Sequence, residues 1–248
     1  MTDAPLAGRV ALVTGGSRGL GAGIADALAN AGADVAINYV RGEAAAAEVA
    51  ARVRSGGRRA LPVRADVSRA AEVDAMFATI RRELGEPLVL VNNAGIMGVR
   101  GVGEVNEADF DTHIAVNLKS AFLVTQAALP AMRAARWGRI VMMSSAAAQT
   151  GGRVGVHYAA SKAGMIGLAH GYAQALAAEG ITVNAIAPAL ISLANDGAAT
   201  RTLADPGAIP VRRFGRVEEC AALTLSALCN GYLTGQTLSL NGGLYMTS

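Results

Sequence analysis

Short apolar runs alternate with stretches of helical periodicity along the whole chain. Apolar runs of strand length occur at 9–16, 34–40, 60–67, 87–95, 138–145, 180–188 and 236–243. Between them lie predicted helices at 20–32, 43–57, 70–84, 107–135, 156–179 and 217–229. Strands that are apolar on both faces and alternate with helices are typical of a parallel sheet covered on both sides. The pattern therefore predicts an α/β fold with a doubly wound, parallel, seven-stranded sheet.

The pattern shows no internal break or linker, so we expect one domain over residues 1–248. A content of 52% hydrophobic and 17% charged residues suits such a domain with a substantial core. One segment, 189–216, is long for a connection within a compact domain. We expect it to form a lid or a binding loop for the substrate.

Charge and cysteine usage narrow the class of protein. The net charge of +3 comes from scattered arginines, and no basic block is interleaved with aromatic residues, which argues against a nucleic-acid partner. No apolar run reaches the roughly 20 residues that span a bilayer, and the first residues lack the features of a signal peptide. Cys220 and Cys229 are predicted to lie on one helix, too far apart for a disulfide. We expect two reduced core thiols in a cytoplasmic protein.

The first strand runs into a glycine-rich turn, TGGSRGLG at 14–21. Gly15, Gly19 and Gly21 would let the backbone turn tightly and approach a pyrophosphate at the helix N-terminus. Ordinary helix packing is the alternative for such glycines. The turn lacks the G-K-S/T ending of a phosphate-binding P-loop, which argues against phosphoryl transfer.

The second strand ends in INYVRGE, which bears on the choice of cofactor. An acid at this strand end favours NAD, whereas a cation is needed for the 2′-phosphate of NADP. Here the strand end carries Asn38, Tyr39 and Arg41, with no acid before Glu43. Arg18 in the glycine turn is a second candidate cation. The sequence therefore predicts NADPH/NADP+ rather than NADH.

Polar residues also follow the next two strands. Asp66 ends the third strand, where it could accept from the adenine amino group or cap the next helix, although Ser68 suits the cap better. The fourth strand ends in NNAG at 92–95. Because parallel strands end at one edge of a sheet, these groups are expected near the glycine turn.

These motifs, with Asn117, Ser145, the pair Tyr158 and Lys162, and NGG at 241–243, stand in the order and spacing of the short-chain dehydrogenase/reductase family. The chain resembles that family over nearly its whole length, and its closing segment is similar to the group that contains 3-oxoacyl-(acyl-carrier-protein) reductases. The resemblance implies a Rossmann fold and a homotetramer built on helices 107–135 and 156–179. The predicted cofactor contacts are Gly15, Ser17, Arg18, Gly19, Leu20, Gly21, Asn38, Tyr39, Arg41, Asp66, Val67, Asn93, Ala94, Gly95, Tyr158, Lys162, Pro188 and Ile191.

The catalytic hypothesis rests on four side chains. Tyr158 and Lys162 are four residues apart, so they share one face of a helix. Free tyrosine has a pKa of about 10, and a neighbouring ammonium would lower it toward neutrality. Ser145 would bind the substrate oxygen, and the resemblance implies that Asn117 holds a water linking Lys162 to solvent. A surface pair and an ordinary cap are the alternative interpretation.

The remaining candidates favour no second site. His157 should point away from its neighbour Tyr158, at the pocket rim or the surface. His113 and His170 have no companions at metal-ligand spacing, so no metal site is expected. Ser145 lacks the G-x-S-x-G context of a hydrolase nucleophile.

The chain departs from the family pattern at two positions. Ala189 follows Pro188 where glycine is usual, and Leu193 replaces a threonine that commonly bonds the nicotinamide carboxamide. The backbone of Ile191 and the hydroxyl of Ser192 remain as possible contacts.

The substrate is the least determined feature. Two clusters could dock an acidic acyl-carrier protein, one of Arg133, Arg136 and Arg139 and one of Arg212, Arg213 and Arg216. Solvated surface is the alternative, because Gln174 and Glu179 stand where carrier-dependent relatives often carry arginine. A 3-oxoacyl thioester is the first hypothesis. Another small ketone, sugar or polyketide carbonyl is the second, and a non-catalytic nucleotide sensor is the third.

Overall fold

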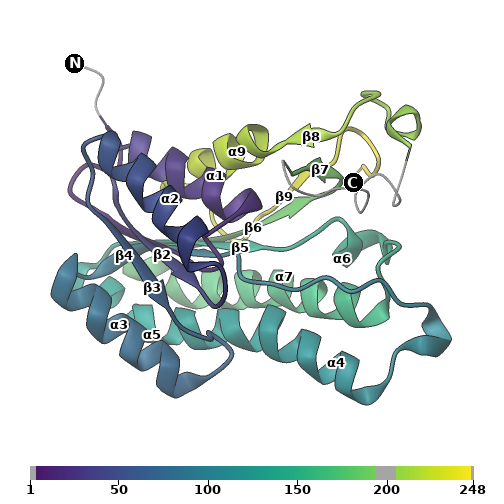
Figure 1. The fold of residues 1–248 in the computed structure, drawn as a ribbon, viewed down its shortest axis with the longest axis horizontal. Coiled ribbons are helices and arrows are strands. Elements are labelled where there is room, and N and C mark those ends of the chain that lie inside the picture. The colour runs from purple at the N-terminus through teal and green to yellow at the C-terminus, as the bar shows by residue number, and fades with distance from the viewer. Residues whose placement is uncertain (1–3, 194–204, 247–248) are drawn as a thin grey trace.

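A seven-stranded parallel sheet forms the centre of the protein (Figure 1). The computed structural model describes residues 4–193 and 205–246. The strands are β1 (Val10–Val13), β2 (Asp34–Tyr39), β3 (Ala60–Arg64), β4 (Pro87–Asn92), β5 (Gly138–Met143), β6 (Ile181–Pro188) and β9 (Thr237–Leu240). Their order across the sheet is β3-β2-β1-β4-β5-β6-β9. The doubly wound sheet is confirmed, with each strand lying inside one of the predicted apolar runs.

Helices cover both faces of the sheet, as Figure 1 shows. One face carries α1 (Gly19–Asn30), α2 (Glu43–Ser55) and α9 (Val217–Cys229), whose buried residues join one hydrophobic cluster with the sheet. The other face carries α3 (Ala70–Glu83), α5 (Ser120–Ala135) and α7 (Val156–Leu176), which form the second cluster. All eight residues of β6 are buried. Burial on two faces explains why these strands read as continuous apolar runs.

The predicted helix 107–135 is continuous but contains a wide turn. It comprises α4 (Glu107–His113), a π-helical turn (Ile114–Lys119) and α5. The whole stretch is long and apolar enough to cross a membrane by length and composition. It packs along the sheet, however, and Val124, Ala128 and Met132 belong to the core. Packing of this kind is typical of a core helix.

The expected lid, 189–216, has a short strand near its start and another at its end, and the sequence pattern did not indicate either strand. β7 (Ile191–Ser192) pairs in parallel with β8 (Gly215–Arg216), as a separate two-stranded sheet. Residues 194–204 of the expected lid lie outside the described residues. The ends of the segment are therefore tied together beside the carboxyl edge of the large sheet.

The cysteines follow the prediction in part. Cys220 and Cys229 both lie on α9 and are free thiols. Cys220 is buried, but Cys229 is exposed, so the expectation of two core residues is wrong for Cys229. It is the last residue of α9, where the helix ends at the surface.

Candidate active site

All strands of the large sheet run parallel, so their carboxyl ends share one edge. The glycine turn after β1, the NNAG motif after β4, Ser145 after β5 and Ala189 after β6 lie at this edge. Ligands of open α/β sheets bind outside the carboxyl ends of the strands. The predicted site residues are thus brought together by topology.

The glycine turn leaves space that a larger residue would fill. Gly15 and Gly19 have φ values of +60° and +56°, which favour glycine. A Cβ on Gly21 would lie 2.4 Å from the carbonyl oxygen of Gly15 and 2.6 Å from Nδ2 of Asn93. Helix α1 begins at Gly19 without a side-chain cap, so its first N–H groups can meet an anion. This cradle fits a dinucleotide pyrophosphate.

Side chains on the neighbouring strand end hold the turn in place. The Asn93 amide donates to the carbonyl oxygens of Thr14 at 2.9 Å and Gly15 at 3.1 Å. Oγ1 of Thr14 accepts from the backbone nitrogens of Asn93 and Ala94, both at 2.9 Å. The N-N-A segment and the glycine turn therefore form one rigid unit. Sequence reasoning missed the role of Thr14, which has no signal beyond its place at a strand end.

The side chains of Asn38 and Tyr39 have structural roles: Asn38 forms hydrogen bonds within the protein, and Tyr39 packs in the core. Asn38 is buried, accepts from the Gly15 backbone and donates to the carbonyl oxygen of Ala65 at 3.0 Å. Tyr39 is buried in the core on the α1 and α2 face. Their predicted contact with the cofactor stays a prediction.

Two exposed arginines follow the first two strands, at the positions where the sequence predicted contacts with the adenosine ribose. Arg18 precedes α1, and Arg41 follows β2. Neither forms an ion pair with any described acid. Their free guanidinium groups fit the 2′-phosphate that distinguishes NADP.

Asp66 is anchored by the turn that follows β3. Its Oδ1 accepts from the Ser68 hydroxyl at 2.7 Å and from the Ser68 backbone at 3.0 Å. The Ser68 bond is the main cause that lowers the pKa of this carboxyl. Ser68 is therefore not the helix cap, because its hydroxyl donates to Asp66 and α3 begins two residues later. The next residue, Val67, is buried.

Tyr158 and Ser145 meet at the carboxyl edge. The Tyr158 hydroxyl lies near enough to the Ser145 side chain to be influenced by it, and Ser145 Oγ accepts from the Ala147 backbone at 3.2 Å. Burial raises the pKa of Tyr158, and the Ser145 side chain lowers it by less. The net direction is thus opposite to the lowering expected from Lys162. Tyr158 is therefore held in its protonated form, ready to donate.

Lys162 lies behind Tyr158 and is buried. Its Nζ is 5.9 Å from the centroid of the Tyr158 ring, and it donates to the carbonyl oxygen of Met143 at 2.8 Å. At this distance, and with its ammonium bonded to Met143, Lys162 does not offset the effect of burial on the pKa of Tyr158. Burial lowers the pKa of Lys162 to about 8.

Asn117 completes the group from the π-helical turn. Its Oδ1 accepts from the Ile96 backbone at 2.7 Å, and its Nδ2 donates to Oγ of Ser161 at 3.0 Å. A Cβ on Gly95 would lie 3.2 Å from Asn117 Oδ1 and 3.4 Å from Lys162 Nζ. Asn117 and Lys162 therefore converge beside the glycine of NNAG. The π-helical turn at this residue is a feature frequently found at functional sites.

Two serines beside the group were not predicted. Oγ of Ser144 donates to the carbonyl oxygen of Lys162 at 2.7 Å, which ties β5 to α7. Ser161 accepts from Asn117 and donates to the carbonyl oxygen of Tyr158 at 2.8 Å. Both residues adjoin predicted catalytic residues in the sequence, which was the only available signal.

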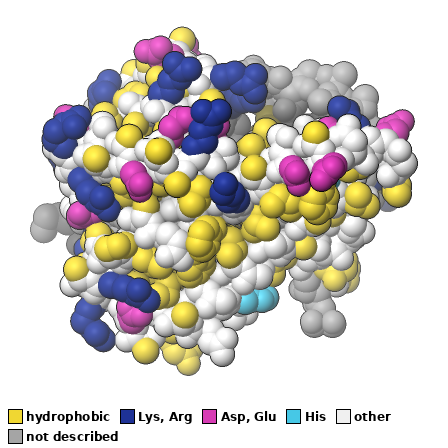
Figure 2. All heavy atoms as spheres, turned by 90° about the horizontal axis from the view of Figure 1, so that it is seen from below, with side chains coloured by type: hydrophobic (Ala, Val, Ile, Leu, Met, Phe, Trp, Pro, Cys, Tyr) yellow, Lys and Arg dark blue, Asp and Glu magenta, His cyan; other side chains and the backbone are white. Residues whose placement is uncertain are grey.

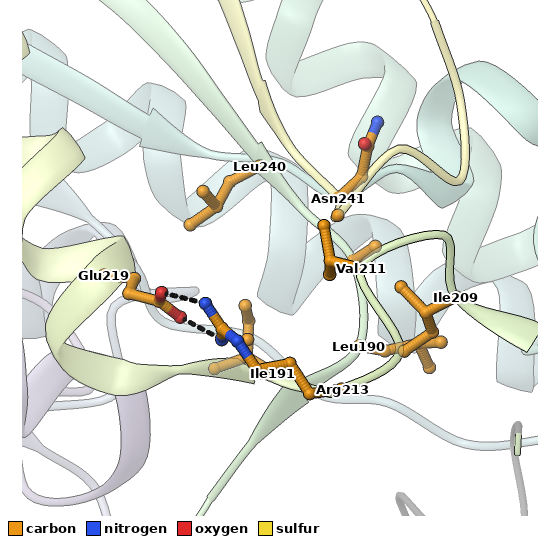
Figure 3. Close-up of a pocket in the computed structure, with 11 residues that line it drawn as sticks. Leu190, Ile191, Ile209, Val211, Arg213, Glu219, Leu240 and Asn241 are labelled. Carbon is orange, nitrogen blue, oxygen red and sulfur yellow. Dashed lines mark hydrogen bonds and ion pairs between the residues drawn. The ribbon is translucent and has the colours of Figure 1, made fainter. Parts of the chain in front are cut away.

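The segment after β6 borders a small cavity (Figure 3). The cavity of about 110 Å³ is lined by Leu190, Ile191 and the ion pair of Arg213 with Glu219, and by none of the four catalytic candidates. Pro188 ends β6, and Leu193 approaches the glycine turn, 3.3 Å from where a Cβ of Gly19 would lie. Leu193 thus lies at the edge of the cofactor cradle.

The first predicted docking cluster lies away from this edge. Arg133 and Arg136 are at the end of α5, and Arg139 is at the start of β5, on the amino side of the sheet. Arg133 is paired with Glu179 at 2.8 Å. In the second cluster, Arg213 and Arg216 are paired with Glu219. Only the second cluster is near the mouth of the site.

His157 lies where the sequence analysis did not place it. It was expected at the rim or surface, but it is fully buried and contacts His113. The His157 side chain does point away from Tyr158, as expected. It points into the protein, because α4 and the loop after β4 cover this side of α7.

Comparison with known proteins agrees with the geometry. The family model for short chain dehydrogenase matches residues 9–203. The 3-oxoacyl-(acyl-carrier-protein) reductase of Staphylococcus aureus is 39% identical over 241 residues, covering 95% of this chain and 98% of that relative. Nodulation protein G of Azospirillum brasilense is 39% identical over 240 residues, with the same two shares.

Solved structures share the fold closely. A blue fluorescent protein from a metagenomic library, in complex with NADPH, has a TM-score of 0.89 and 35% identity over 98% of this chain and 100% of its own. A mutant short-chain dehydrogenase/reductase from Serratia marcescens has a TM-score of 0.89 and 34% identity, covering 96% of this chain and 98% of that chain.

Proposed function

Because the chain belongs to the short-chain dehydrogenases, we propose that it is an NADPH-dependent carbonyl reductase whose substrate is a 3-oxoacyl thioester. The observation that carries the proposal is a chain of contacts: Ser145 lies near the Tyr158 hydroxyl, Lys162 Nζ is 5.9 Å from the centroid of the Tyr158 ring, and Lys162 meets Asn117 beside Gly95. The four side chains come from three separate parts of the chain, the turn after β5, α7 and the π-helical turn, which a surface pair or an ordinary cap does not require.

The side chains supply the proton and hold the carbonyl. The Ser145 and Tyr158 hydroxyls lie beside each other, so a substrate oxygen that reaches both accepts from both, as in an oxyanion hole. Tyr158 gives its proton to that oxygen. NADPH, when bound, supplies the hydride to the carbonyl carbon. We expect Lys162 to bind the ribose hydroxyls of the cofactor and to return a proton to Tyr158.

Proton return to Tyr158 follows a path through Asn117. Its amide connects the Ile96 backbone to Ser161, one residue before Lys162. We assign Asn117 the role of holding this path open to solvent. The Asn117→Ala variant should slow turnover while leaving NADPH affinity within about twofold.

The preference for NADPH is supported by the free guanidinium groups of Arg18 and Arg41, and by the NADPH complex of a structural relative. We expect Arg41→Asp to weaken NADPH binding and to strengthen NADH binding, because the acid repels the 2′-phosphate and accepts from the 2′-hydroxyl. Fluorescence titration of both cofactors measures this. An unchanged ratio of the two dissociation constants would exclude Arg41 from the site.

A substrate panel tests the thioester assignment, which rests on the names of relatives such as that of S. aureus. NADPH oxidation is followed with acetoacetyl-CoA, an acetoacetyl acyl-carrier thioester, and small ketone and sugar carbonyls. Turnover of thioesters above all others supports the proposal. Turnover of ketones or sugars alone would overturn it in favour of the second hypothesis.

Tyr158→Phe separates an enzyme from a nucleotide sensor. Loss of the hydroxyl should lower the rate of carbonyl reduction by at least 100-fold, while NADPH still binds. Tyr172→Phe is the matched control, because the Tyr172 hydroxyl bonds Gln126 at 2.9 Å, outside the catalytic group. Unchanged turnover in Tyr158→Phe would contradict the assignment.

We further propose that the protein is a cytoplasmic homotetramer. Hydrophobic side chains form a band across the face that carries α4 and α5 (Figure 2). Phe110 and Phe122 on these helices are 41% and 43% exposed. A second copy of the chain would cover such a surface. A carrier-protein partner would meet the second arginine cluster, since only that cluster is near the site.

A further inference from the structure

Two histidines that the proposed reaction does not use meet beneath the active-site edge. His113 on α4 and His157 on α7 have ring centroids 4.1 Å apart, with the rings at 82° to each other. His157 is 0% exposed and His113 6%. Their contact lies where α4, α7 and the loop that follows NNAG come together.

Each ring is fixed by one hydrogen bond to a backbone carbonyl. His157 Nε2 donates to the carbonyl oxygen of Gly98 at 3.0 Å, and His113 Nδ1 donates to that of Asp109 at 2.8 Å. A carbonyl oxygen only accepts, so these bonds assign the ring proton to those two nitrogens. Within the described part of the chain, His157 Nδ1 and His113 Nε2 have no hydrogen-bond partner. Each ring therefore has one bond, and the bond of His157 reaches the loop.

The loop is anchored at alternate residues. Ile96 is bound to Asn117 through both its nitrogen and its oxygen. Gly98 is bound to His157, and the Arg100 nitrogen donates to the carbonyl oxygen of Val154 at 2.9 Å. Residues 97 and 99, between these anchors, expose apolar side chains.

The two loop residues between the anchors have exposed side chains: Met97 is 52% exposed and Val99 is 54% exposed. They follow Gly95, which lies against Lys162 and Asn117. An acyl chain leaving the catalytic group has apolar surface to meet here. Gly98 lies between Met97 and Val99, so its bond to His157 fixes the backbone that carries both side chains.

Gly155 shows how closely the anchor is packed. A Cβ on Gly155, whose φ is +138°, would lie 2.5 Å from Cε1 of His157 and 3.0 Å from the carbonyl oxygen of Arg100. Any larger residue here would push His157 and the loop apart. Gly155 therefore offers a second variant that disturbs the same contact.

We propose that His157 is a positioning residue that fixes the loop 96–100, so that Met97 and Val99 form the wall contacted by the acyl chain. The choice of an acyl chain rests on the proposed function. His113 supports His157 from α4. The Gly98 bond acts through the loop on substrate binding and does not touch the reacting atoms.

Kinetics with two chain lengths test the proposal. We expect His157→Ala to raise KM for a medium-chain 3-oxoacyl-CoA by about 10-fold, with a smaller rise for acetoacetyl-CoA. The kcat and the NADPH dissociation constant should stay within about twofold. His157→Gln should restore KM, because its amide can donate to the Gly98 carbonyl, and Gly155→Ala should resemble His157→Ala. Equal losses for both substrates, or no advantage of Gln over Ala, would overturn the proposal.

Hydrogen exchange gives a readout that does not depend on the substrate. The Arg100 amide, bound to Val154, should exchange faster in His157→Ala and regain protection in His157→Gln, while the Ile96 amide, bound to Asn117, stays protected. Loss of Arg100 protection without any thioester turnover would refute the thioester assignment and keep the loop anchor. Thioester turnover with unchanged Arg100 protection would refute the anchor alone.

Discussion

At the scale of single residues, Lys162 shows a conflict between function and stability. Its ammonium is buried with no described acid beside it, and its pKa falls from 10.5 to about 8. A shift of this size corresponds to a cost of about 3 kcal/mol for burying the charged lysine. Lys162→Met should abolish reduction and raise the unfolding temperature by several degrees.

The gain in Lys162→Met should depend on pH. Below about pH 8 the lysine is protonated in both states, so burial of the charge has its full cost. Between pH 8 and about 10.5 only the unfolded chain keeps the proton, so the cost declines and the two melting curves approach each other. Lys119→Met, at an exposed position, is the control and should shift little. A lower melting temperature for Lys162→Met at pH 7 would contradict this.

Leu193 is a second residue with a measurable consequence. It approaches the glycine turn at Gly19, where the family pattern has a threonine. Leu193→Thr should tighten NADPH binding by roughly 2- to 10-fold, because one new hydrogen bond contributes about 0.5–1.5 kcal/mol. Leu193→Val removes bulk without adding a hydroxyl and should leave the dissociation constant near that of the parent. Equal binding by Thr and Val variants would exclude the hydrogen bond.

The sequence predicted which residues gather at the site better than it predicted their state. Two residues four positions apart on a helix share one face, so the proximity of Tyr158 and Lys162 was foreseeable. The raised pKa of Tyr158 was not, because it depends on how deeply the folded chain buries the hydroxyl. The inward direction of His157 was equally hidden, since its partners Gly98 and His113 come from other elements.

At the scale of elements, the start of α1 depends on close contact with the strand-end turn. A methyl group on Gly21 would meet the Gly15 carbonyl at 2.4 Å, and that backbone has little room to move. Gly21→Ala should therefore displace the turn, cost about 1–3 kcal/mol in stability and weaken NADPH binding by more than 10-fold. Thermal melting and cofactor titration measure both effects.

Gly171 provides the matched control for Gly21. It lies inside α7 with no atom within 4 Å of a Cβ. Gly171→Ala should stabilise the protein by up to about 1 kcal/mol, because alanine favours helix, and should leave NADPH binding unchanged. Opposite signs for the two variants are expected. Equal effects would show that the contact at Gly21 has no special role.

Elements with long apolar patterns were predictable, and short ones were not. Each strand of the large sheet was visible because burial on two faces leaves a run of apolar residues, as in β6. β7 and β8 have two residues each and pair only with one another, so no periodicity marks them. The π-helical turn at Asn117 was hidden inside an otherwise continuous helical pattern.

At the scale of the whole molecule, the exposed hydrophobic residues of α4 and α5 indicate that this face meets other copies of the chain. A charge at Phe122, which is 43% exposed, would be buried without a partner if this face meets another copy. Phe122→Glu should therefore dissociate the tetramer, as light scattering after size exclusion would show. Ala47→Glu, at an exposed position of α2 on the opposite face of the sheet, should leave the mass unchanged. An intact tetramer in Phe122→Glu would place the interface elsewhere.

The strand order also affects the protein during its synthesis. β9 is the last strand in the chain, yet it covers the edge of β6, whose eight residues are all buried in the finished fold. Until the ribosome has made residues 237–240, β6 is an uncovered apolar edge strand that can pair with other chains. Translation that stops shortly before β9 should thus yield a chain that aggregates, even though the glycine turn, NNAG and the catalytic group are already present.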